Sequence, residues 1–223
     1  MTTFVLIHGA GDVAWYWHLV ERDLRERGHD VVAVDLPTDD DSAGLAAYTD
    51  TVVEAIGDRT DLVVVGQSLG GFTAPLVCDR VDADLLVLVA AMVPSPGETG
   101  MDWWANTGHD EAAPEGEEHD GSDIAVFLPD VPPDLAAEAL SYARDQSATP
   151  LQEPWPLDAW PDVPTRYLLC RQDRFFPAEW TRGMVRDRLG LTPDEMDGGH
   201  TPALSRPKEL ADRLDAYAAK GAE

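Results

Sequence analysis

The stretch Leu62-Val63-Val64-Val65-Gly66-Gln67-Ser68-Leu69-Gly70-Gly71 decides the fold of this chain. Its opening apolar run predicts a buried strand, and a helix is expected to follow from Leu69. The pattern G-x-S-x-G between them is typical of a sharp strand-to-helix turn that holds a serine clear of the sheet. Backbone N–H groups at the amino end of the helix can then stabilise an oxyanion beside Ser68. A glycine- and serine-rich turn without chemistry is the alternative.

Apolar runs alternate with helical segments on both sides of this stretch. Strands are predicted at residues 4–7, 31–34, 62–65, 85–89, 165–170 and 194–196, and helices at 15–27, 42–56, 72–80, 133–146, 177–189 and 204–219. Because the strands are continuously apolar, the pattern indicates βαβ units and a mostly parallel sheet of about six strands, with helices on both faces. Binding sites in such sheets lie at the carboxyl ends of the strands. Ser42 is the predicted N-cap of the second helix.

Residues 94–161 interrupt this alternation, because no strand is predicted there. The segment is rich in proline and carries an acidic run over residues 115–123. Tryptophans recur along it, at Trp103, Trp104, Trp155 and Trp160. A long excursion with its own helix, and with tryptophans that need burial, predicts a lid over the site, and a surface insertion is the alternative. We expect a single domain with a core of residues 1–93 and 162–223.

The composition predicts a globular, acidic protein. The chain has 223 residues, 44% of them hydrophobic, and 42 acidic residues against 16 basic ones give a net charge of −26. This charge argues against nucleic acid, anionic membranes and polyanionic substrates as partners. No apolar run approaches the ~20 residues that span a bilayer, and no signal peptide precedes His8. We therefore expect a cytoplasmic protein that acts on a small molecule as a monomer or homodimer.

The cysteines and histidines give no sign of a metal site. Cys78 and Cys170 form no C-x-x-C pattern, and they are expected to be reduced, buried thiols. The six histidines are scattered without the spacing of metal ligands. We therefore expect neither a metal nor a cofactor.

Three residues have the order and spacing of a catalytic triad. A serine hydroxyl is a weak nucleophile that needs a histidine base, and the histidine needs an acid to orient it. Behind a G-x-S-x-G turn, the acid and then the histidine are expected after later strands. Asp173 follows the strand that ends at Cys170, and His200 follows the last predicted strand. The predicted catalytic residues are therefore Ser68, Asp173 and His200.

Other residues fit these roles less well. His109 and His119 fall inside the predicted lid. The segment 90–94, after the fourth strand, offers no acid. Asp35 precedes the serine, and Asp197 is too close along the chain to the histidine to reach it comfortably. A solvated aspartate and a surface histidine in a glycine turn are the alternatives for the two partners.

The second oxyanion donor is expected in the loop after the first strand. That loop has the sequence His8-Gly9-Ala10-Gly11. We predict the backbone N–H groups of Ala10 and Leu69 as the pair of donors. His8 is expected to orient the loop rather than to catalyse.

Several motifs in combination resemble one family. They are Ile7-His8-Gly9-Ala10 with Trp15 and Trp17, the turn from Gly66 to Gly71, the run from Arg171 to Pro177, and Gly199-His200 with the run from Leu204 to Pro207. Together they resemble the methyl esterase and hydroxynitrile lyase branch of the α/β-hydrolase superfamily, of which this chain looks like a bacterial member. The resemblance covers the chain except the lid. It implies an α/β-hydrolase fold with a helical lid insertion.

Within this branch, two positions separate the activities. Its cyanohydrin lyases carry threonine in place of Gly9 and a lysine, which stabilises the leaving cyanide, in place of Thr201. The resemblance therefore implies ester hydrolysis, although the esterases of the branch usually have methionine at Thr201 and histidine at Gln67. Gly9 and Thr201 are expected to contact the substrate. Trp103 and Trp104 are expected either to line the pocket or to form the core of the lid.

The expected reaction is hydrolysis of a small carboxylic ester, thioester or lactone through an acyl-enzyme. A cofactor-free lyase or cyclase with the same triad is one alternative. A ligand-binding homologue with little turnover is another. Dehalogenase chemistry is disfavoured, because it needs an aspartate where Ser68 stands.

Overall fold

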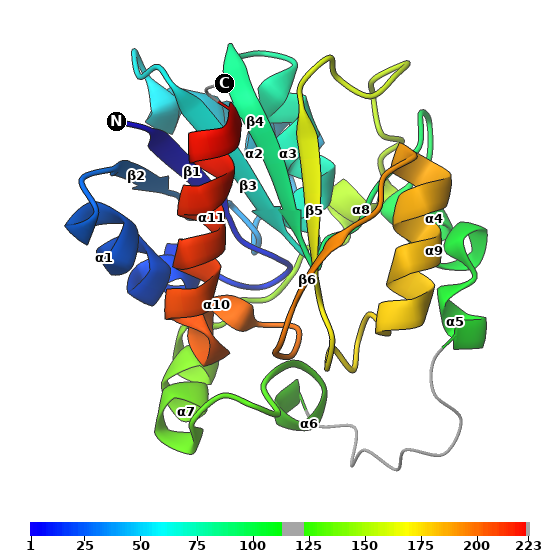
Figure 1. Ribbon diagram of the computed structural model, residues 1–223. Coiled ribbons are helices and arrows are strands. Elements are labelled where there is room, and N and C mark those ends of the chain that lie inside the picture. The colour runs from blue at the N-terminus through cyan, green and yellow to red at the C-terminus, as the bar shows by residue number, and fades with distance from the viewer. Residues whose placement is uncertain (113–122, 222–223) are drawn as a thin grey trace.

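A parallel sheet between two layers of helices forms the body of the protein (Figure 1). The computed structural model describes residues 1–112 and 123–221, so that His119 and residues 115–122 of the acidic run lie outside the described residues. The strands lie in the order β2-β1-β3-β4-β5-β6, and neighbours pair in parallel. Their bounds are β1 (Thr3–Ile7), β2 (Asp30–Ala33), β3 (Leu62–Gln67), β4 (Ala83–Val89), β5 (Thr165–Cys170) and β6 (Asp194–Met196). The predicted fold class is confirmed.

Helices cover both faces of the sheet. One face carries η1 (Ala14–Trp17), α1 (His18–Glu26), α10 (Pro202–Ser205) and α11 (Pro207–Gly221), and the other carries α2 (Leu45–Ile56), α3 (Gly70–Cys78) and α9 (Ala178–Leu189). Helix α1 packs against α11, and α2 packs against α3. In the described part of the chain, no helix has both the length and the apolar character needed to cross a membrane.

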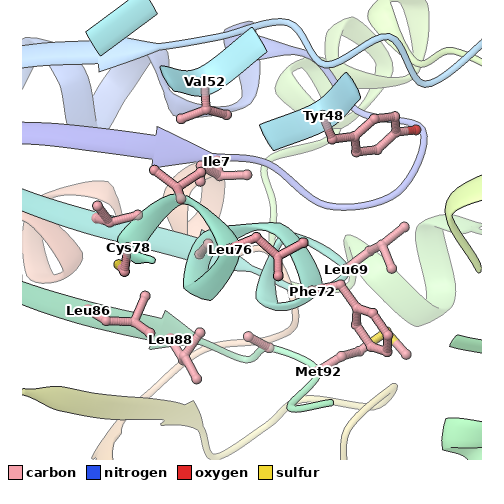
Figure 2. Close-up of a cluster of buried hydrophobic side chains, with 14 of the residues drawn as sticks. Ile7, Tyr48, Val52, Leu69, Phe72, Leu76, Cys78, Leu86, Leu88 and Met92 are labelled. Atoms are coloured by element: carbon pink, nitrogen blue, oxygen red, sulfur yellow. The ribbon is translucent and has the colours of Figure 1, made fainter. Parts of the chain in front are cut away.

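The core on the α2 and α3 face fixes the helix that follows the central strand. Figure 2 shows Phe72 and Cys78 of α3 in one cluster with Ile7 of β1 and Leu86 of β4. All residues of α3 are buried, and each large apolar side chain taken from water stabilises the fold by roughly 1.5–3 kcal/mol. The amino end of α3 is therefore held firmly at the carboxyl end of β3. Cys78 and Cys170 are both buried free thiols, as predicted.

The predicted N-cap of the second helix is wrong. Helix α2 begins at Leu45, after Gly44, and Ser42 lies outside it, where its hydroxyl donates to Asp40 Oδ1 at 2.6 Å. The first free N–H group of the helix, on Leu45, donates instead to Glu153 Oε2 at 2.8 Å. A carboxylate from a distant part of the chain thus satisfies the group that a local serine was expected to satisfy.

Two other predicted helices differ from the expectation, one because it is divided and the other because it is shorter. The segment predicted at 204–219 is divided into α10 and α11 at Arg206 (φ −137°, ψ 45°), because the following Pro207 disfavours the helical conformation there. The segment predicted at 133–146 ends at Tyr142, because Ala143 is extended (φ −55°, ψ 140°). The chain then turns towards the loop after β1.

Residues 94–161 are called the insertion below. Their described part contains helices and loops but no strand. The helices are α4 (Gly100–Thr107), α5 (His109–Ala112), α6 (Asp123–Phe127), α7 (Pro133–Tyr142) and α8 (Thr149–Gln152). Trp103 and Trp155 are fully buried, and their indole N–H groups donate to the carbonyl oxygens of Val93 and Phe72. The insertion is therefore packed onto the core through these tryptophans. The domain boundaries at residues 93 and 162 stay a prediction.

Candidate active site

The turn between β3 and α3 holds Ser68 in a conformation that few residues other than glycine adopt. Its φ of +52° lies in the left-handed region. The turn is also crowded, because a Cβ atom on Gly66 would lie 2.8 Å from the Cβ of Ala74. One on Gly70 would lie 2.8 Å from the carbonyl oxygen of His8. Glycine at both positions lets the turn close and leaves Ser68 at its tip, as the G-x-S-x-G pattern predicts.

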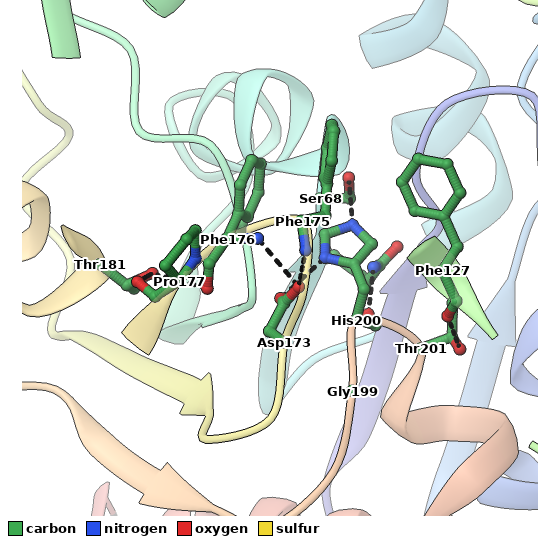
Figure 3. Close-up of polar contacts among 12 residues, drawn as sticks. Ser68, Phe127, Asp173, Phe175, Phe176, Pro177, Thr181, Gly199, His200 and Thr201 are labelled. Carbon is green, nitrogen blue, oxygen red and sulfur yellow. Dashed lines mark hydrogen bonds and ion pairs between the residues drawn. The ribbon is translucent and has the colours of Figure 1, made fainter. Parts of the chain in front are cut away.

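Ser68, His200 and Asp173 form one chain of hydrogen bonds (Figure 3). The serine Oγ lies 3.0 Å from His200 Nε2, and His200 Nδ1 lies 2.8 Å from Asp173 Oδ2. The other carboxylate oxygen accepts the backbone N–H groups of Phe175 and Phe176 at 2.8 and 2.9 Å. All three side chains are buried. The structure thus brings together the three residues that the sequence order predicted.

The backbone on both sides of the histidine is also fixed. Gln67 Nε2 donates to the carbonyl oxygen of His200 at 3.0 Å. The N–H group of Gly199 donates to Asp130 Oδ2 at 2.9 Å. Sequence reasoning missed Asp130, because no local pattern indicates that a carboxylate of the insertion reaches this loop. These two contacts restrict how far the imidazole can move from the serine.

A second contact joins the insertion to this loop. The hydroxyl of Thr201 donates to the carbonyl oxygen of Phe127 at 2.7 Å. The ring centroids of Phe127 and Phe175 lie 5.6 and 5.1 Å from that of His200. The histidine therefore packs between aromatic rings, which keep water away from its edges.

The loop after β1 presents two N–H groups beside the serine. Ala10 and Leu69 both lie in the wall of the cavity around Ser68. Neither of their backbone N–H groups donates a hydrogen bond to any residue that the structure describes. Free donors at the amino end of a helix and in the facing loop suit a developing oxyanion.

His8 holds the shape of this loop. Its Nδ1 donates to the carbonyl oxygen of Gly9 at 2.8 Å, and its Nε2 accepts the N–H group of Leu36 at 3.1 Å. This pattern requires the neutral imidazole. Burial lowers the pKa of His8 to about 4, which keeps the ring neutral. The position agrees with the predicted role in orienting the loop.

Residues that follow α7 in the insertion form hydrogen bonds with the loop after β1. The N–H group of Gly11 donates to Gln146 Oε1 at 3.0 Å, and the N–H group of Arg144 donates to the carbonyl oxygen of Gly11 at 2.7 Å. Gln146 Nε2 in turn donates to the hydroxyl of Tyr48 at 3.1 Å. Nothing in the sequence indicated Gln146, because the contact depends on where α7 ends.

A cavity of about 370 Å³ opens beside Ser68. Most of its wall is apolar, and the insertion supplies much of that wall. The larger apolar lining side chains are Leu69, Met92, Trp104, Phe127, Leu128, Leu140, Leu151, Phe175 and Leu204. Gly9, Trp104 and Thr201 line the cavity. Trp103 does not, because its indole is fully buried in the core behind Trp104, as in the alternative predicted for the two tryptophans. A contact between Trp103 and the substrate is therefore not supported.

Space around Gly9 is very limited. A Cβ atom there would lie 2.7 Å from Gln67 Oε1 and 2.9 Å from the Cβ of Ser68. A threonine at this position would need both neighbours to move. The local packing therefore selects glycine.

The cavity also contains a carboxyl group that sequence reasoning missed. Asp12, directly after the loop, lies in the cavity wall. Burial raises the pKa of Asp12 to about 6. Among the described residues, no cluster of three or more histidine, cysteine, aspartate or glutamate side chains could hold a metal ion.

Comparison with known proteins relates the whole chain to others. Residues 4–213 match the model of a protein family that is described as "Alpha/beta hydrolase family". Among curated proteins, the chain is similar to Methylesterase 7 of Arabidopsis thaliana, at 25% identity over 96% of this chain and 97% of that protein. It is also similar to Norfluorocurarine synthase 2 of Strychnos nux-vomica, at 26% identity over 97% of this chain and 95% of that protein.

Solved structures show the same fold. Polyneuridine aldehyde esterase superposes with a TM-score of 0.82, at 21% identity over 98% of this chain and 99% of that one. A pyrethroid hydrolase from Sphingobium faniae JZ-2 superposes with a TM-score of 0.80, at 23% identity over 98% and 97% of the two chains. With the match over nearly its whole length, the chain belongs to the alpha/beta hydrolase family, as its motifs predicted.

Proposed function

We propose that the protein is a serine hydrolase that cleaves a small carboxylic ester, thioester or lactone through an acyl-enzyme. Ser68 is the nucleophile, His200 the general base and Asp173 the residue that orients the histidine. The observation that carries this proposal is the continuous hydrogen-bond chain from Ser68 Oγ through His200 to Asp173, with distances of 3.0 and 2.8 Å. Nucleophile, base and orienting acid are the groups that acyl transfer requires.

The first half of the reaction follows from this geometry. Asp173 accepts a hydrogen bond from the Nδ1–H group of His200, so that the unprotonated Nε2 can take the proton of Ser68 as Oγ attacks the carbonyl carbon. The negative charge that forms on the carbonyl oxygen is met by the N–H groups of Ala10 and Leu69. The imidazolium then gives its proton to the leaving alcohol, and the acyl group remains on Ser68.

Water completes the cycle. His200 Nε2 takes a proton from a water molecule, which attacks the acyl carbon and forms a second oxyanion in the same position. Collapse of this intermediate returns the proton to Ser68 and releases the acid. Apart from the substrate and this water molecule, the proposed steps use only groups of the chain.

The cavity and the relatives support an ester as substrate. An apolar wall and a volume of about 370 Å³ suit a small acyl or alcohol group, apolar or aromatic. A methylesterase, an aldehyde esterase and a pyrethroid hydrolase, by their names, are among the similar proteins. The insertion, which supplies Trp104 and Leu140 to the wall, acts as a lid in this proposal.

A cofactor-free lyase or cyclase with the same residues is the alternative. The crowding at Gly9 excludes the threonine that cyanohydrin lyases of the resembling branch carry. Thr201 replaces their lysine. Mandelonitrile cleavage is therefore not expected, and its detection would favour the alternative.

Hydrolysis of 4-nitrophenyl acetate and butyrate tests the proposal. The wild type should release nitrophenolate, and a fluorophosphonate should add one mass label at Ser68. Ser68→Ala should lose both, whereas Ser141→Ala, which removes an exposed serine on α7, should keep both. A wild type that neither turns over the esters nor takes the label would refute the proposal.

A further inference from the structure

A carboxyl group lies unneutralised in the wall of the cavity. Asp12 Oδ1 accepts the N–H group of its neighbour Val13 at 2.9 Å. Among the residues that the structure describes, Asp12 has no ion pair and no other hydrogen bond. Asp12 is partly buried, and a carboxylate in a mainly apolar cavity wall normally has a cation or several donors around it, because its charged form is otherwise costly. Asp12 therefore has capacity for a partner from outside the chain.

The cationic side chains that line the cavity in the described structure are engaged elsewhere. Two lining residues carry or can acquire a positive charge, Arg144 and His200. The guanidinium of Arg144 faces Asp35 Oδ2 at 3.4 Å, on the exposed side of the wall. His200 is held between Ser68 and Asp173. The nearby polar side chains are likewise engaged, since Gln146 binds Gly11.

On one side, Asp12 adjoins an apolar cluster. Its negative charge acts on the neighbouring Tyr16, whose hydroxyl is buried and has its pKa raised mainly by burial and in part by this charge. Tyr16 packs in the cluster that includes Leu128 and Leu204, and both of these also line the cavity. Asp12 is thus a carboxyl group in a mostly apolar wall, and a few placed polar groups in such a wall are how binding pockets fix the orientation of a ligand.

We propose that Asp12 is a specificity-determining residue that binds a protonated amine of the substrate, so that the natural substrate is an ester that carries a basic nitrogen. An ammonium group would donate a charge-assisted hydrogen bond to the free Oδ2 and neutralise the carboxylate. The rest of the substrate would lie along the apolar wall. The net charge of −26 would also draw cations to the protein.

That the substrate is an ester rests on the function proposed above, whereas the binding of an amine by Asp12 does not. Binding is therefore measured without turnover, in Ser68→Ala, by titration calorimetry at neutral pH. Dimethylaminoethyl butyrate is compared with 3-methylbutyl butyrate, which has a carbon in place of the nitrogen. A second pair, methyl 4-(dimethylamino)butanoate and methyl 5-methylhexanoate, places the amine in the acyl part instead.

In at least one pair, the amine is expected to bind about tenfold or more tightly than its neutral counterpart, as for a charge-assisted hydrogen bond in a cavity. Asp12→Asn in the same background should abolish this preference and leave the affinity for the neutral ester within about twofold. Asp39→Asn, which removes the same charge from an exposed loop residue, should keep the preference. The melting temperature of each variant verifies that it is folded.

Two results would overturn the inference. One is the absence of a preference for the amine in both pairs. The other is a preference that survives in Asp12→Asn or that falls equally in Asp39→Asn, because the general field of the protein would then be its source. A wild type that binds the amines but hydrolyses no ester would refute the proposed function and leave the role of Asp12 standing.

Discussion

Gln146 accepts a hydrogen bond from the N–H group of Gly11 at 3.0 Å, across 135 positions of the chain. Gly11 follows Ala10, whose own N–H group is one of the two proposed oxyanion donors. The bond therefore fixes the peptide next to that donor. Because Gln146 belongs to the insertion, the position of the insertion and the shape of the oxyanion loop are coupled.

Gln146→Leu should lower kcat for a 4-nitrophenyl ester. Loss of one oxyanion donor costs ~10²–10³ in kcat, and loosening a donor should cost less, roughly tenfold to hundredfold. KM should change little, because the contact acts on the transition state. Gln152→Leu makes the same change at an exposed position on α8 and should keep the wild-type kcat. An unchanged kcat in Gln146→Leu would show that the loop keeps its shape without this bond.

Gly9→Thr should abolish ester hydrolysis while the protein remains folded. Even Gly9→Ala should reduce it, because the added Cβ would lie within 3 Å of Gln67 Oε1 and of the Cβ of Ser68, at 2.7 and 2.9 Å. The readout is the steady-state rate together with the melting temperature. Shortening the neighbour in Gly9→Ala/Gln67→Ala should restore part of the rate lost in Gly9→Ala. No restoration would mean that the contact with Ser68 dominates the clash.

Asp173→Asn should lower kcat by about 10⁴. The carboxylate uses one oxygen for the N–H groups of Phe175 and Phe176 and the other for the Nδ1–H group of His200. The amide has only one oxygen, and its NH₂ group would face Nδ1 instead. The imidazole is then left in the wrong tautomer. Single-turnover kinetics would locate the loss in acyl transfer. Asp162→Asn, at an exposed position, is the matched control. A variant with nearly full activity would remove Asp173 from the proposed triad.

Asp12→Asn should stabilise the fold at neutral pH. Burial raises the pKa of Asp12 from 3.8 in the unfolded chain to about 6 in the fold, so the wild type loses stability as pH rises through this range. Above it, the variant should be more stable by about 1–3 kcal/mol, and near pH 4 the difference should vanish. Tyr16 stays neutral throughout, because its pKa is raised.

Urea unfolding of both proteins at a series of pH values measures this difference. A stability gap that is constant with pH would show that Asp12 titrates normally. If the variant is more stable, the wild type loses stability by keeping Asp12, as is expected of a group that is kept for binding.

The sequence predicted the architecture because the responsible signals are local. Each strand is a short apolar run, and the turn at Ser68 needs its glycines for reasons of close packing within a few residues. The order of Ser68, Asp173 and His200 along the chain also follows from the fold, since each residue lies in the loop or turn that follows a strand of the parallel sheet. Such features are determined by the sequence alone.

Only the tertiary structure decided which residues support and line the site. Whether Trp103 or Trp104 reaches the cavity depends on the rotation of α4 against the core. The contacts of Gln146 with Gly11 and of Asp130 with Gly199 join segments far apart in the chain. No local pattern encodes these contacts, because their geometry is set by how the insertion packs on the completed sheet.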